Sequence, residues 1–413
     1  MTEMLTHLLP YLDKHLALGI LGYYQSKGID CGEAIEEMFS RTAMLPTGDI
    51  RPGHEEQIAS MTDSCAVALD LFFDKSEEEI CTYRFKLTST EVDQLRAQGE
   101  LAVDYLSTKG VTPQVMQNMM RLAFLYYDKG AYVDAAEILS FCKAVTGAGL
   151  VRDNLLWGKL LCDTASTNWA SAIAVADEIR NNQNFVGRFE TKNTTTTRSR
   201  AWLLHWVLFP FFKGSIQGTE HLLQYVFDNR PNDTNRTNAD PKMFELYRSV
   251  VESACPHLLR YICAAVLLNR SRQHHFRHTA TMTEQIYEYS DALTRLVQLI
   301  HRSALEEALD LLPEVEELLD LDYFLCDLKN DILESARSVI FQRYIAIHTV
   351  VSIPYVAGKL GVSKEEAEIW LVNLISSSRQ RAKVDSVNEQ LRMMPTVHPV
   401  ESTMLEKLES VRH

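Results

Sequence analysis

The sequence lacks an apolar run long enough to cross a membrane. Its longest, residues 201–212, is about a dozen residues with His205 and Pro210 inside it, whereas a spanning helix needs about 20 apolar residues. The polar triplet Asp-Lys-His at 13–15 interrupts what would have to be the apolar part of a signal peptide. We therefore expect a soluble, cytoplasmic protein with no membrane partner.

The common catalytic motifs are also absent from the sequence. It contains no GxGxxG, GxxxxGK[ST], GxSxG or HExxH pattern, so the usual phosphate loop, nucleophile elbow and zinc-protease helix are missing. Its eight cysteines are scattered without a CxxC pair, which favours free buried thiols over disulfides or zinc. We expect a protein that is not an enzyme and has no cofactor, metal or small-molecule substrate.

An excess of basic residues is missing too. Lys and Arg number 41 against 55 Asp and Glu, which gives a net charge of −14. Such a charge opposes binding of nucleic acid through the overall field, so RNA would have to be met by a local patch. The candidate contacts with RNA or an acidic partner are Arg270, Arg272, Arg277, Arg379 and Arg381.

The segment around the first three of these arginines, NRSRQHHFRHT, has three interpretations. The first is a solvated basic loop, and the second is a contact with ribosomal RNA or an acidic partner. The third is a metal site, because His274 and His278 are four residues apart and would share one face of a helix. The surrounding arginines oppose a cation, so the metal site is the least favoured of the three.

Apolar residues recur every three or four positions along most of the chain, which predicts helices. Within residues 121–142, Gly130 separates two stretches rich in alanine and tyrosine at the spacing of a tetratricopeptide-like helix pair. A looser copy follows, with Trp157 on its first helix and Trp169 on its second. Long polar stretches at 183–200 and 228–242 are expected to be loops.

Three large side chains, Trp202, His205 and Trp206, raise the question of a stacking platform for bases. Their i, i+3 and i+4 spacing inside an apolar helix favours core packing instead.

From residue 331 the pattern changes to that of a winged helix. Gly361 ends a helix, and Ser363 with Glu366 forms a capping box that starts the next one. The predicted order is a helix (332–349), a β-branched stretch (350–353), a helix (355–360), a helix (363–378) and two wing strands (382–387 and 391–394).

The recognition helix of this winged helix is acidic, because Glu365, Glu366 and Glu368 follow Ser363. Carboxylates at that end would repel DNA phosphates, so DNA reading is disfavoured. An outer wing strand can instead extend a sheet across two subunits through main-chain hydrogen bonds. The residues that we expect at this wing edge are Ala382, Lys383, Val384, Asp385, Leu391 and Met393.

After Pro395 and Pro399 the tail resumes a helical apolar stripe. A helix this short is marginal in water on its own, so we expect it to bind partner helices; a frayed tail is the alternative. The stripe is made of Val400, Met404, Leu405, Leu408 and Val411.

Helical repeats that run into a winged helix resemble the PCI-domain family of scaffold subunits. Within this family the sequence is similar to the e subunits of eukaryotic translation initiation factor 3. The matching stretches are LDKHL, WGKL, NWASA, RAWLLHWVLFPFF, ACPHLLRYICAAV and VSKEEAEIWLVNLISSSRQRAKVDS. The loops between them diverge from the family pattern, which puts contacts specific to one species in doubt.

The resemblance implies a non-catalytic scaffold subunit of initiation factor 3 that supports small ribosomal subunit binding and mRNA recruitment. It implies contacts with other subunits through winged-helix edges and a bundle of C-terminal helices. The alternatives are a PCI subunit of the proteasome lid or signalosome, or a nucleic-acid-binding winged-helix protein. The expected fold is all-α, with an N-terminal helical region (1–110), helical repeats (111–330), a winged helix (331–394) and a tail helix (395–413).

Charging the tail stripe tests its proposed role. Met404→Glu combined with Leu408→Glu should release the protein from its complex, because carboxylates cannot be buried against partner helices without a large cost. Affinity purification measures the release, and circular dichroism should give an unchanged helical content. Unchanged assembly would exclude the tail as a contact.

Overall fold

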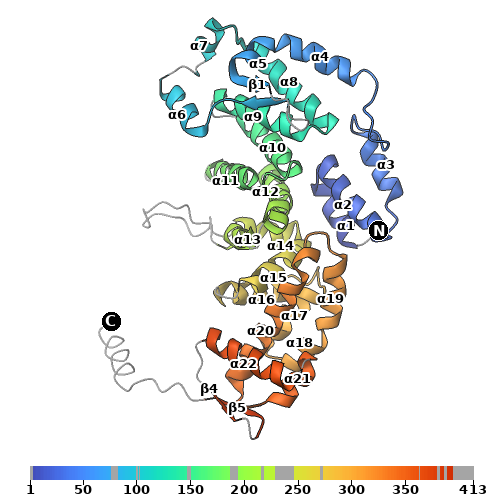
Figure 1. Cartoon of the computed structure of the whole chain (residues 1–413), viewed down its shortest axis with the longest axis vertical. Helices are drawn as coiled ribbons and strands as arrows, with labels where there is room; N and C mark the ends of the chain where they lie inside the picture. The colour runs from blue at the N-terminus through green and yellow to red at the C-terminus, as the bar shows by residue number, and fades with distance from the viewer. Residues whose placement is uncertain are drawn as a thin grey trace, which may run out of the picture. The chain divides into compact units, whose positions relative to one another are not determined.

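The computed structural model describes residues 3–75, 82–98, 101, 103–146, 150–186, 194–214, 218–227, 246–269, 273–361, 363–378, 382–385 and 388–393 (Figure 1). Helices dominate, which confirms the predicted all-α fold. Packing divides the chain into two compact units, Met1–Leu258 with Leu321–Asp327, and Leu259–Asp320 with Leu328–His413. The four domains expected from the sequence stay a prediction.

The first unit contains the N-terminal helices and the repeats. Its helices are α1 (Glu3–Leu8), η1 (Leu9–Tyr11), α2 (Lys14–Ser26), α3 (Gly32–Ser40), α4 (His54–Ser64), α5 (Ala66–Phe72), α6 (Ser89–Ala97), α7 (Val103–Thr108), α8 (Pro113–Lys129), α9 (Tyr132–Val145), α10 (Leu150–Ala165), α11 (Trp169–Val186), α12 (Thr194–Trp206), η2 (Pro210–Gly214), α13 (Gly218–Val226), α14 (Leu246–Ser253) and η4 (Pro256–Leu258). Its strands are β1 (Phe73–Lys75) and β2 (Tyr83–Phe85).

The second unit contains the remaining helices and the winged helix. Its helices are α15 (Leu259–Leu268), α16 (Gln273–Gln285), α17 (Ala292–Arg302), α18 (Leu305–Asp310), α19 (Leu312–Leu321), α20 (Lys329–Ile347), α21 (Ile353–Leu360) and α22 (Lys364–Ser378). The short helix η5 (Cys326–Leu328), which precedes α20, begins in the segment 321–327 of the first unit. Its strands are β3 (Val350–Ser352), β4 (Ala382–Asp385) and β5 (Gln390–Met393).

The predicted tetratricopeptide-like pair is present as α8 and α9, and α8 to α11 pack in succession (Figure 1). Thr112 caps α8 by accepting from the N–H of Val115 at 3.4 Å. Gly130 ends this helix with φ at 93°, a conformation that L side chains rarely adopt. A Cβ at this position would lie 2.8 Å from the sulfur of Met44. The turn between the two helices therefore requires glycine.

Polar contacts fasten the N-terminal segment to the repeat helices. The Asp13 carboxylate caps α2 by accepting from the backbone N–H of His15 at 3.0 Å, and it also accepts from the Tyr127 hydroxyl on α8. His15 is buried, and its Nδ1 lies 2.9 Å from the Tyr132 hydroxyl on α9. The stretch at 12–16 therefore serves packing between α2 and the first repeat.

Two buried imidazoles join α12 to η4. The Nδ1 atom of His205 lies 2.6 Å from the carbonyl oxygen of Ala201, and the Nε2 atoms of His205 and His257 lie 2.8 Å apart. A carbonyl oxygen can only accept, so Nδ1 of His205 carries the proton and its Nε2 accepts from His257. The Tyr11 ring stacks on His205 with ring centroids 4.2 Å apart. This geometry needs neutral imidazoles.

Two sequence-based expectations about this unit are wrong. Residues 183–200 were expected to form a loop, but α11 continues to Val186 and α12 begins at Thr194, because threonine is tolerated in the first turn of a helix. No strand was predicted before the winged helix, yet β1 and β2 form an antiparallel pair with Phe73 opposite Phe85. Strands of three residues are too short to give an alternating pattern.

Within the described residues, no single helix is long and apolar enough to span a bilayer. One bent pair, Tyr247–Ser253 with Pro256–Leu268, passes on length and composition alone.

We expect the free energy of unfolding to fall when the pH drops from 7.5 to 5.5. Burial lowers the pKa of both His15 and His205 from 6.5 to about 4, so the unfolded chain binds more protons than the folded one in this window. One pH unit below 6.5, each histidine should cost about 1.4 kcal/mol. Urea unfolding followed by tryptophan fluorescence at both pH values measures the loss.

Glutamine does not titrate, so the unfolding free energy of His205→Gln should fall only about half as much between pH 7.5 and 5.5. This holds even if the variant is less stable at pH 7.5. His278→Gln, at an exposed position on α16, is the matched control and should keep the full loss. A loss that His205→Gln leaves unchanged would contradict the assignment.

Candidate protein interface

In the winged helix, residues close to the helix ends determine where α21 ends and where α22 begins. The N–H of Ser363 donates to the Glu366 carboxylate at 3.1 Å, and the N–H of Glu366 donates to Ser363 Oγ at 3.2 Å, which confirms the capping box. Gly361 ends α21 with φ at 68°, as predicted. The Trp370 ring of α22 packs edge-on against Phe341 of α20 with centroids 5.4 Å apart. The ring contact fixes α22 against α20.

The wing is a three-stranded antiparallel sheet in which β5 lies between β3 and β4. Leu391 of β5 pairs with Val351 on one side and with Val384 on the other. The sequence predicted a two-stranded wing with Leu391 and Met393 at its edge. This is wrong for both residues, since they lie in the central strand, and Leu391 is also buried in the core. The third strand is β3. Its β-branched residues were noted from the sequence, but their pairing with β5 was not predicted.

The direction of the main chain in β4 follows from the hydrogen bonds of β5. The N–H of Met393 donates to the Thr349 carbonyl at 2.8 Å, and the N–H of Ile353 donates to the Glu389 carbonyl at 3.0 Å. Odd-numbered residues of β5 therefore bond toward β3, and Gln390 and Arg392 bond toward β4. Their partners in β4 are Asp385 and Lys383, respectively.

Because alternate residues of a strand bond to opposite sides, the N–H and C=O of Val384 point away from β5. Among the described strands, β4 has a neighbour on one side only. Four of the predicted edge residues, Ala382 to Asp385, thus lie in a strand whose other side is open to a further strand. The side chains of Lys383 and Val384 are exposed there.

The outer face of α22 adds apolar surface to the same winged helix. Ile369 is 63% exposed and Val372 is 43% exposed, and their spacing of three residues puts them on one face of the helix. Across the described residues, five of the twelve exposed large apolar side chains belong to the winged helix: Ile347, Val350, Ile369, Val372 and Val384. The α22 pair was not predicted from the sequence, although helical periodicity could have indicated it.

The charges on α22 oppose phosphate binding. Glu365 and Glu366 are exposed in its first turn. Lys364, the basic residue of that turn, is paired with Glu389 at 2.8 Å. An acidic and apolar surface beside an open strand fits another polypeptide better than it fits nucleic acid.

Of the five arginines predicted to contact RNA or an acidic partner, the structure describes one. Arg277 is exposed on α16, so the expectation of a loop is wrong for the residues from Gln273 onward; burial of Phe276 and Thr279 stabilises the helix there. The arginines that lie outside the described residues are Arg270, Arg272, Arg379 and Arg381. The tail residues Val400, Met404, Leu405, Leu408 and Val411 also lie outside them.

Burial makes three of the thiols poor nucleophiles. Burial raises the pKa of Cys142 and Cys162 to about 12 and that of Cys255 to about 11, so these thiols stay protonated near neutral pH. Within the parts of the chain that are described, no group of three or more His, Cys, Asp or Glu side chains is placed to hold a metal ion.

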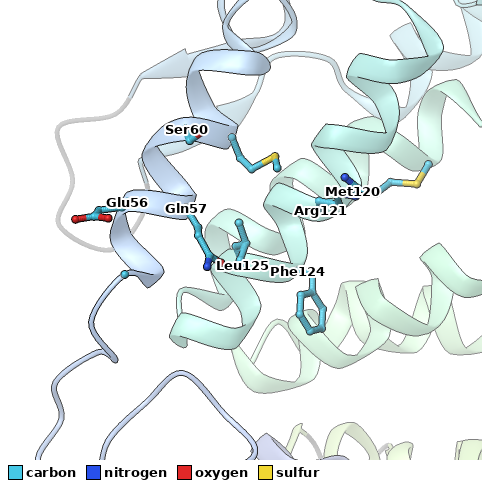
Figure 2. A pocket seen from close by; sticks show the side chains of 9 residues that line it. Glu56, Gln57, Ser60, Met120, Arg121, Phe124 and Leu125 are labelled. Carbon is cyan, nitrogen blue, oxygen red and sulfur yellow. The ribbon is translucent and has the colours of Figure 1, made fainter.

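A groove of about 750 Å³ lies between α4 and α8 in the first unit (Figure 2). Gln57 and Ser60 line it from α4, and Met120 and Leu125 line it from α8. Phe124 is 59% exposed at its side. Flexible methionine and an exposed aromatic ring are typical of surfaces that adapt to a partner.

Known proteins resemble the chain over nearly its whole length. The pattern of the PCI domain matches residues 284–394. The E subunit of eukaryotic translation initiation factor 3 from Bombyx mori is 29% identical, over 91% of this chain and 85% of its own length. Proteins of the same name from Aspergillus niger and Phaeosphaeria nodorum are 26% and 27% identical, over 99% and 93% of this chain and 90% and 88% of their own lengths.

Hydrogen exchange tests the open side of β4. We expect the amide of Val384 to exchange much faster than those of Lys383 and Asp385, because only the latter two bond to β5. Val384→Pro should accordingly cost about 1 kcal/mol less stability than Lys383→Pro, since only the second removes a ladder hydrogen bond. Equal protection of Val384 and Lys383 in the isolated protein would rule out an open edge.

Proposed function

Because the chain belongs to the family of E subunits of eukaryotic translation initiation factor 3, a family of PCI-domain proteins, we propose that it is a non-catalytic scaffold subunit of initiation factor 3. The observation that carries the proposal is the length of the match, 91% to 99% of the chain in the relatives named above. A match of that length includes the repeats as well as the winged helix. As part of the complex, the protein supports binding of the small ribosomal subunit and recruitment of mRNA.

The winged helix supplies the main contact with a neighbouring subunit. The open side of β4 accepts a strand from the partner, and main-chain hydrogen bonds to Val384 provide affinity without a particular side-chain sequence. Ile369 and Val372 on α22 contribute apolar area beside it. A protein that works in this way needs neither a cofactor nor an activated nucleophile.

Two further contacts follow from the sequence. The apolar tail stripe that includes Met404 and Leu408 joins a bundle of partner helices. Arg277, which is exposed on α16, offers a local positive charge to RNA or to an acidic partner. The net charge of −14 confines any RNA contact to such local positions.

Removing one outward amide tests the strand contact. Val384→Pro lacks the N–H that would donate to the partner strand, so the variant should co-purify at least tenfold less of the other initiation factor 3 subunits. Val384→Thr is the matched control, because it keeps the amide and the β-branched shape; it should assemble like the unchanged protein. Full assembly of Val384→Pro would exclude strand addition at β4.

Sedimentation tests the complex itself. The tagged full chain should sediment with small ribosomal subunits, together with initiation factor 3 subunits, in a complex that salt weakens. Co-fractionation with proteasomes or with isopeptidase activity would instead assign the protein to another PCI complex. Tight binding of the isolated chain to duplex DNA would also contradict the proposal.

A further inference from the structure

A cavity of about 630 Å³ opens within the first unit between the N-terminal segment 10–13 and the helices α10, α11 and α12. It lies wholly inside this unit. The proposed scaffold function makes no use of it.

Helical spacing brings aromatic and acidic groups together in this cavity. Asp153 and Trp157 are four residues apart on α10, and Trp202 and Trp206 are four apart on α12, so each pair shares one face of its helix. All four residues line the cavity. Their spacing in the sequence predicted that Trp202, His205 and Trp206 pack in the core. This is right for His205, which is fully buried, but the two tryptophans are half-buried at the cavity wall.

These groups are held in place by contacts that need no ligand. The indole N–H of Trp206 donates to the Tyr11 carbonyl at 2.9 Å, and the Trp157 ring lies edge-on to Trp206 with centroids 5.1 Å apart. The side-chain amide of Asn182 donates to Oδ1 of Asp153 at 3.2 Å. A rigid wall of this kind loses little entropy when a ligand binds.

The charges of the cavity select a cation. Asp13 and Asp153 are acidic, and no Lys or Arg is among the described residues that line it. Phosphate is therefore repelled, which disfavours nucleotides and RNA. A guanidinium can stack on indole and form paired hydrogen bonds to one carboxylate, which an ammonium cannot do. Arg198, which lies 4.9 Å from the centroid of Trp202, already stacks in this way at the same helix.

The cavity also offers a donor for a peptide backbone. Gln183 lines it, and the side-chain oxygen of Gln183 accepts from the Tyr247 hydroxyl at 2.9 Å. Its Nε2 atom is enclosed and has no hydrogen-bond partner within the part of the chain that the structure describes. An enclosed donor without a partner is costly, and a main-chain carbonyl that enters the cavity would satisfy it.

We propose that this cavity binds an arginine side chain presented by an extended segment of another protein. The guanidinium lies against the tryptophan wall and pairs with Asp153. The segment runs past Gln183, which donates to its main chain. The site adds a contact that is specific for one side chain. This proposal does not depend on the proposed strand contact at β4.

Binding of short peptides to the purified full chain tests the proposal. The probe is the blocked peptide acetyl-Gly-Ser-Gly-Arg-Gly-Ser-Gly-amide, titrated against tryptophan fluorescence. Replacing the arginine by citrulline keeps its shape and removes its charge, and this peptide should bind at least tenfold more weakly. A lysine peptide should also bind more weakly, because it cannot make the paired hydrogen bonds.

Asp153→Asn should weaken binding of the arginine peptide at least tenfold, while its amide still accepts from Asn182. Asp93→Asn, on the exposed surface of α6, makes the same change in net charge and should have no effect. The proposal fails if citrulline binds as well as arginine or if Asp153→Asn binds normally. It also fails if an oligouridine binds more tightly than the arginine peptide, or if binding is undetectable at about 10 mM, the range of the weakest specific contacts.

Discussion

The hydrogen-bonding geometry of β4 is the feature of the second unit that most favours binding of another polypeptide. A β-strand has two hydrogen-bonding sides, and in this sheet β5 is central, so β4 uses one side for β5 and turns the N–H and C=O of Val384 outward. Water can satisfy these groups, but a strand from another protein satisfies them in an ordered way. The exposed Ile369 and Val372 on α22 belong to the same small domain. An open strand and apolar surface together favour a polypeptide partner.

In the first unit, hydrogen bonds join segments that are far apart in the sequence. Asp13 and Tyr11 hold the N-terminal segment against α8 and α12, and His205 of α12 is bonded to His257 of η4. The matching stretches at 200–212 and 254–266 therefore meet through these two imidazoles. These contacts are hydrogen bonds made by two buried imidazoles, the Asp13 carboxylate and the Tyr11 carbonyl.

The sequence predicts features that depend on neighbours in the chain. Gly130 and Gly361 end helices in the left-handed conformation, and the capping box at Ser363 starts α22, because each of these signals acts over a few residues. Features that depend on distant partners were not predicted. The central position of β5 requires pairing with β3 across some forty residues, and short strands carry no information about their partners.

The tryptophans of α12 illustrate the same limit. Spacing inside an apolar helix shows that Trp202 and Trp206 share a face, but it does not reveal whether a neighbouring helix covers that face. In the structure, α10 and α11 instead leave a cavity there, with Asp153 at its wall. A hydrophobic pattern therefore predicts that a residue is sheltered from water. Only the three-dimensional arrangement separates a filled core from a binding pocket.

The candidate surfaces of the two units carry charge of the same sign. The cavity carries Asp13 and Asp153, and the first turn of α22 carries Glu365 and Glu366, in a chain whose net charge is −14. Each of these surfaces repels phosphate and attracts either main-chain groups or basic side chains. Since the same sign recurs at separate surfaces, both surfaces favour groups of a protein over phosphate.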